Sequence, residues 1–111
     1  MRKFAGLVVF PAPDLAAAKK VYTALLGSEP YVDKPYYVGY RVDDVEIGLD
    51  PNGPAGGPIV YWDTDDIAAS VSELEAEGCS LKGAAKDVGG GMLVATLADA
   101  AGNVFGLRQK P

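Results

Sequence analysis

Short apolar stretches alternate with two amphipathic segments along this chain, and the same order of features occurs twice. In each half a β-branched apolar stretch leads to an acidic residue and then to apolar residues at helical spacing, in residues 6–26 and again in 58–77. Asp14 and Asp66 occupy equivalent places in the two copies. A repeat of this kind in a short chain predicts two copies of one supersecondary unit that share a core.

Each copy is predicted to contain one strand, one helix and three further strands. The first helix follows Asp14 and stops at Gly27, and the second begins at Asp65 or Asp66 and stops at Gly78. The predicted strands cover residues 3–10, 29–34, 36–42, 45–50, 59–63, 81–88, 92–98 and 104–109. Because only the first strand of each copy is followed by a helix, the expected fold class is α+β.

Asp43 and Asp44 separate two of these strands and predict a hairpin in which Val42 lies opposite Val45. One face of the hairpin is expected to be core, and the other is expected to be wetter. The core face would carry Tyr36, Val38, Tyr40, Val42, Val45, Ile47 and Leu49, and the wetter face would carry Tyr37, Gly39, Arg41, Glu46, Gly48 and Asp50.

The whole chain, residues 1–111, is predicted to be a single domain, with a first module at 3–50, a linker at 51–57 and a second module at 58–109. The linker is dense in glycine and proline, which favour turns. With 49% hydrophobic and 23% charged residues, the composition is that of a globular protein rather than a disordered one. No stretch approaches the roughly 20 apolar residues of a membrane span, so a cytoplasmic protein without membrane contact is expected.

Charge and residue content exclude several functions. The formal charge of −5 argues against nucleic acid as a partner and favours a neutral or cationic small molecule. The chain has no histidine, which removes the commonest general base and the usual partner of a catalytic serine. The single cysteine, Cys79, is predicted to pack as a small hydrophobic residue against the sheet.

The two βαβββ copies, the acidic residue that opens each helix and the closing stretch GNVFGL resemble the vicinal oxygen chelate superfamily. That group includes glyoxalase I, extradiol dioxygenases, fosfomycin-resistance enzymes and bleomycin-resistance proteins. The resemblance covers residues 3–109 and implies two βαβββ modules that form a cupped mixed sheet with the helices outside. For metal-dependent members it also implies four ligand positions, which fall here on Leu7, Gly48, Ile59 and Gly106. None of these has a donor side chain, so neither a metal nor a cofactor is expected.

Side-chain alternation from these four positions predicts which residues line the cup. The predicted ligand-binding residues are Leu7, Val9, Tyr37, Arg41, Glu46, Gly48, Ile59, Tyr61, Asp63, Gly106 and Arg108. They would form an apolar floor opened by glycines, a tyrosine wall, and an acidic and a basic group near the rim. Such a surface suits a flat aromatic or amphipathic molecule. Trp62 follows Tyr61 in the same strand, so its side chain is expected on the other face, where it is predicted to pack under the second helix.

Three functions remain open. The first is a metal-free binding protein of the bleomycin-resistance type that sequesters an aromatic or amphipathic compound, a cationic one included. The second is a glyoxalase-like lyase or isomerase without metal-dependent catalysis, with Glu46 and Tyr61 as candidate catalytic residues. The third is a structural or regulatory module whose cup is filled by its own side chains. A homodimer is expected in each case, because exposed sheet edges invite pairing with another chain.

Overall fold

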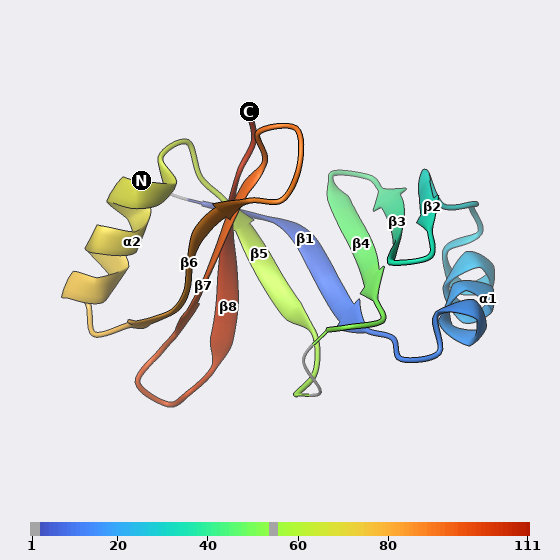
Figure 1. Cartoon of the computed structure of the whole chain (residues 1–111), viewed down its shortest axis with the longest axis horizontal. Coiled ribbons are helices and arrows are strands. Elements are labelled where there is room, and N and C mark those ends of the chain that lie inside the picture. Colours follow the sequence, from blue (N-terminus) through green and yellow to red (C-terminus); the bar gives the residue numbers. More distant parts are fainter. Residues whose placement is uncertain (1–2, 54–55) are drawn as a thin grey trace. The chain divides into compact units, whose positions relative to one another are not determined.

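A computed structural model describes residues 3–53 and 56–111, so residues 54–55 of the predicted linker lie outside the described residues. The elements are β1 (Phe4–Pro11), α1 (Leu15–Leu26), β2 (Val32–Lys34), β3 (Tyr37–Val42), β4 (Val45–Asp50), β5 (Ile59–Asp63), α2 (Ile67–Ala76), β6 (Ser80–Asp87), β7 (Leu93–Ala98) and β8 (Val104–Gln109) (Figure 1). The predicted α+β class with two βαβββ modules is confirmed. The chain divides into an N-terminal unit, Leu7–Ile59, and a C-terminal unit, Met1–Gly6 with Val60–Pro111.

The sheet of the N-terminal unit has the strand order β2-β3-β4-β1, in which β1 is parallel to β4 and the other pairs are antiparallel. Val42 lies opposite Val45, as the hairpin prediction requires. Helix α1 covers one face of this sheet, and the core lies between them. Its buried residues are Ala12, Val38, Tyr40 and Leu49, with Phe10, Leu15, Ala18, Tyr22, Leu26 and Ile47 packed around them.

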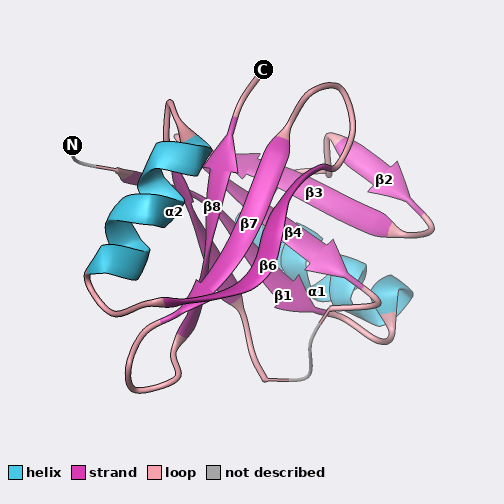
Figure 2. Ribbon diagram, turned by 60° about the vertical axis from the view of Figure 1, so that its left-hand side comes forward, coloured by secondary structure: helices cyan, strands magenta, loops and turns pink. Residues whose placement is uncertain are grey.

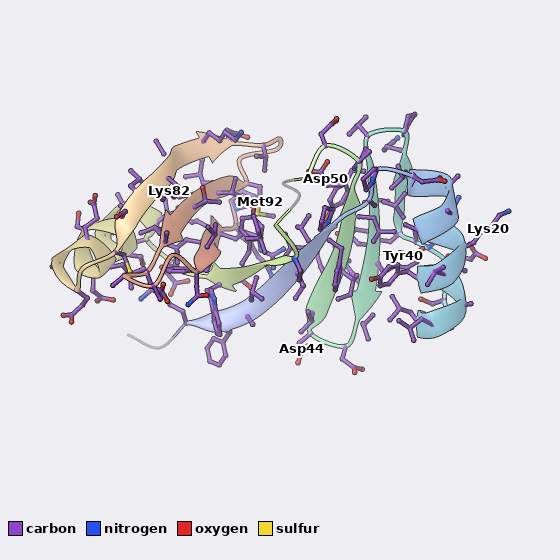
Figure 3. All side chains as sticks on the ribbon, turned by 90° about the horizontal axis from the view of Figure 1, so that it is seen from below. Lys20, Tyr40, Asp44, Asp50, Lys82 and Met92 are labelled. Atoms are coloured by element: carbon purple, nitrogen blue, oxygen red, sulfur yellow. The ribbon has the colours of Figure 1, made fainter. Side chains whose placement is uncertain are left out.

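Tyr40 ties this sheet to its helix. The side chain is fully buried and extends from β3 toward α1, whereas Lys20 lies on the outer side of the helix (Figure 3). The Tyr40 hydroxyl donates a hydrogen bond to the Lys19 carbonyl oxygen at 3.1 Å and lies 2.8 Å from Thr23 Oγ1. A buried phenol must find such partners, so Tyr40 also fixes how α1 sits on the sheet.

The sheet of the C-terminal unit repeats the same arrangement, with the strand order β5-β8-β7-β6 and β5 parallel to β8. Helix α2 packs over β6, β7 and β8 (Figure 2). The buried residues beneath it are Ile67, Ala95, Leu97 and Leu107, with Val71, Leu74, Cys79, Leu93 and Phe105 around them. The prediction that Cys79 packs as a hydrophobic residue is confirmed.

The two helices begin in the same way. The Asp14 carboxylate accepts a hydrogen bond from the Ala17 backbone N–H at 3.1 Å, and the Asp66 carboxylate accepts one from Ala69 at 3.0 Å. Each satisfies a donor that has no partner inside the helix. Asp66, rather than Asp65, is therefore the cap of α2. No helix in the described ranges is long and apolar enough to cross a membrane.

Two aromatic residues predicted to be core are exposed. Trp62 is 39% exposed, because the main contacts of α2 are with β6, β7 and β8 rather than with β5. Tyr36 is 66% exposed, because it precedes the first paired residue of β3 instead of belonging to the strand. The edge strand predicted at 29–34 is also shorter, since β2 covers only Val32–Lys34.

Candidate functional site

In each unit the helix covers one face of the sheet, and we call the other face the open face of that unit. Strand pairing places most of the predicted lining residues on these two faces. In the N-terminal unit Val9, Gly48 and Gly39 are neighbours across three strands, and Leu7, Glu46 and Arg41 form the next row. The alternate residues, including Val38, Tyr40 and Leu49, form the core on the helix side. The open face of the N-terminal unit therefore carries Leu7, Val9, Tyr37, Gly39, Arg41, Glu46 and Gly48.

The Tyr37 ring lies directly over Gly48. A Cβ atom at Gly48 would overlap the Tyr37 hydroxyl oxygen and would lie 2.8 Å from Cζ and 2.9 Å from Cε1. The same ring is close to Gly39, where a Cβ would be 3.0 Å from Tyr37 Cε2. Two glycines on paired strands thus make a flat floor that accepts an aromatic ring.

Tyr31 also belongs to this face, and the sequence did not identify it. Its backbone N–H donates to the Gly39 carbonyl oxygen at 2.9 Å, and its hydroxyl donates to Glu46 Oε2 at 2.5 Å. The Arg41 guanidinium lies over the Tyr31 ring, 4.2 Å from its centroid. Partial burial raises the pKa of the Tyr31 hydroxyl and the bond to Glu46 raises it further, whereas Arg41 acts in the opposite direction.

The C-terminal unit contains an equivalent tyrosine and glycine pair. Tyr61 on β5 is paired with Gly106 on β8. A Cβ atom at Gly106 would overlap Cδ1 and Cε1 of Tyr61 and would lie 2.9 Å from its Cγ. The open faces of both units therefore present a tyrosine ring that covers a glycine.

Asp63 and Arg108 lie one step further along the same strands. Arg108 Nε donates to Asp63 Oδ1 at 2.7 Å, and Nη2 donates to Oδ2 at 3.1 Å. Arg108 is only 3% exposed, whereas the Asp63 side chain is 28% exposed, so the arginine is buried in a pair that is partly open to solvent. Gly6 makes room for this pair, since a Cβ there would overlap Asp63 Oδ2 and lie 2.6 Å from Arg108 Nη2.

The remaining predicted residues are divided between the two units. Ile59 is partly buried and belongs to the N-terminal unit, although it is the first residue of β5. Glu46 and Tyr61, the two candidate catalytic residues, belong to different units, and Glu46 Oε2 accepts a hydrogen bond from the Tyr31 hydroxyl.

A groove of about 630 Å³ lies in the C-terminal unit, where β5 ends. Among the predicted lining residues only Asp63 borders it. Its lining residues are Lys3, Phe4, Asp63, Thr64, Asp65, Lys110 and Pro111.

A family model matches residues 5–107, nearly the whole chain, and is described as the glyoxalase/bleomycin resistance protein/dioxygenase superfamily. The chain belongs to this superfamily. The resemblance inferred from the sequence is therefore confirmed. No curated protein sequence matches the chain.

Solved structures with the superfamily fold are similar across nearly the whole chain. A hypothetical protein from Bacillus halodurans C-125 has a TM-score of 0.81 at 14% identity, over 100% of this chain and 96% of that one. A superfamily member from Vibrio splendidus 12B01 has a TM-score of 0.68 at 20% identity, over 98% of both chains. A variant of Streptomyces coelicolor methylmalonyl-CoA epimerase in complex with 2-nitronate-propionyl-CoA has a TM-score of 0.73 at 15% identity, over 99% of both. At these identities the likeness shows the fold alone.

The metal site implied by the superfamily does not fit the residues present. Leu7 and Ile59 are aliphatic, and the space next to Gly48 and Gly106 is taken by tyrosine rings. Zinc and similar ions need several nitrogen, sulfur or carboxylate ligands that converge on one point. Within the described part of the chain, no group of three or more His, Cys, Asp or Glu residues could hold an ion.

Proposed function

We propose that this superfamily member is a metal-free binding protein that holds a flat aromatic or amphipathic small molecule against the open face of a unit. The observation that carries the proposal is the tyrosine ring over a glycine in each unit, Tyr37 on Gly48 and Tyr61 on Gly106. Aromatic pairs add about 0.5–1.5 kcal/mol beyond area burial, so a rigid ring on a flat floor suits a planar ligand. The epimerase complex supports the proposal, because its fold holds a small molecule.

Replacing either tyrosine with alanine is expected to weaken binding of planar aromatic compounds by about 1 to 2 kcal/mol, because the ligand loses its stacking surface. Calorimetric titration with a panel of quinones, naphthalenes and aromatic antibiotics measures this loss. Tyr36→Ala is the matched control, since Tyr36 is 66% exposed and precedes β3, and it should bind like the wild type.

Two results would contradict the proposal. One is a wild-type protein that binds no compound of the panel more tightly than roughly millimolar. The other is binding that requires added Zn²⁺, Ni²⁺, Mn²⁺ or Fe²⁺ and disappears with a chelator.

A metal-independent lyase or isomerase is the second candidate. The hydrogen bond between the Tyr31 hydroxyl and Glu46 supports it, because a carboxylate positioned in this way can accept a proton. Transfer of solvent deuterium into a bound compound would favour this function over simple sequestration.

The homodimer expected from the sequence stays a prediction. Strand β6 is an edge strand of eight residues, nearly all exposed, and an edge of this length invites pairing with a second chain. Light scattering should give twice the 11.5 kDa chain mass at micromolar concentration. A mass that stays at that of one chain would rule out the dimer.

A further inference from the structure

Arg41 lies on the open face of the N-terminal unit. Its neighbours hold the side chain in place but leave much of it exposed. Its guanidinium stacks 4.2 Å from the centroid of the Tyr31 ring, which limits the motion of a long side chain. Its side chain is nevertheless 67% exposed. A cation that is fixed on one side and open to water on the other can exchange that water for a ligand.

Glu46 does not saturate this cation. Arg41 Nε lies 4.0 Å from Glu46 Oε1, which is longer than a hydrogen bond. The other carboxylate oxygen of Glu46 accepts the Tyr31 hydroxyl at 2.5 Å. The guanidinium has five N–H donors in a planar fork, so it retains donors that match two oxygens of a carboxylate.

The same surface places Arg41 next to the aromatic floor. The rings of Tyr31 and Tyr37 flank Gly39, where a Cβ would be 3.4 Å from Tyr31 Cε1 and 3.0 Å from Tyr37 Cε2. Gly39 is two residues before Arg41 on β3, so all of these groups share one face. A planar molecule on the tyrosines would therefore have its edge within reach of the guanidinium.

We propose that Arg41 anchors the carboxylate of a planar aromatic acid whose ring system lies against Tyr37. This inference rests on the proposed function and adds the chemical class of its ligand. The net charge of −5 favours a cationic partner at long range. At the site itself the planar N–H donors of Arg41 match a carboxylate, and salt screens the more distant charges.

A matched pair of probes tests the charge preference: 2-naphthoate and 2-naphthamide, which share the ring and differ in the acidic group. In calorimetric or NMR titrations of the full chain, naphthoate is expected to bind about tenfold more tightly than naphthamide. Arg41→Gln should remove this difference by weakening naphthoate alone. Arg41→Lys should restore only part of it, because lysine keeps the charge and loses the fork.

Lys20→Gln is the control, since Lys20 is an exposed cation on the outer side of α1 and its loss changes the net charge equally (Figure 3). It should leave both affinities unchanged. Equal wild-type affinities for the two probes would overturn the arginine anchor and leave the proposed function standing. Equal effects of Arg41→Gln and Lys20→Gln would also overturn it. Failure of both probes to bind would also overturn the anchor, whereas the proposed function fails only if no compound of the wider panel binds.

Discussion

Replacing Asp63 with alanine is expected to lower the free energy of unfolding by about 3 to 5 kcal/mol, the usual cost of removing one partner from a buried ion pair. Asp63 supplies both oxygens of the bidentate contact to Arg108. Arg108 is 3% exposed and stays charged, so loss of the carboxylate takes two hydrogen-bond acceptors from a buried cation. Thermal or urea unfolding of the variant measures the loss.

The two partners should not be equally costly to remove. The Asp63 side chain is 28% exposed, against 4% for Arg108, so the carboxylate keeps access to water when the arginine is lost. Arg108→Met is therefore expected to cost less than Asp63→Ala, and Asp63→Leu combined with Arg108→Met should recover much of the stability. Glu73→Ala, which removes an exposed partner of Lys3, is the control and should leave the melting temperature nearly unchanged. A loss below about 1 kcal/mol for Asp63→Ala would contradict this account.

The fold could be predicted because its signals are local and occur twice. Asp14 and Asp66 each cap a helix at the same place in the repeat, and apolar spacing after them sets the face that each helix buries. The hairpin turn at Asp43 and Asp44 fixes the register of β3 and β4, and with it the residues that share the open face.

The site could be predicted only in part, because its missing details depend on contacts between distant segments. Tyr31 reaches the open face through the pairing of the short edge strand β2, which no local pattern specifies. Burial of Arg108 depends on β5 and on the space left by Gly6. The exposure of Trp62 depends on which strands α2 packs against. The alternation of side chains along a strand tells which face a residue is on, but it does not tell what surrounds the side chain there.

Gly106→Ala is the second change with a large expected effect. Alanine normally improves a strand over glycine by about 0.5–1 kcal/mol, because it loses less backbone freedom on folding. Here the added Cβ would overlap two atoms of the Tyr61 ring and lie 2.9 Å from its Cγ. A contact so close to the base of the ring cannot be relieved by a small rotation, so we expect a loss of about 2–3 kcal/mol from overpacking. Displacement of Tyr61 should also weaken binding of planar compounds.

Gly48→Ala provides the comparison, because the first atom met there is the hydroxyl at the far end of Tyr37. The clash there is with the far end of the ring rather than with its base, so Gly48→Ala should cost less than Gly106→Ala. Combining Gly106→Ala with Tyr61→Ala should cost less than the sum of the two single changes, because the clash disappears with the ring. Urea unfolding of the three single variants and the double variant gives this coupling energy. Strict additivity, or equal losses at the two glycines, would mean that the Tyr61 ring does not lie on Gly106 in solution.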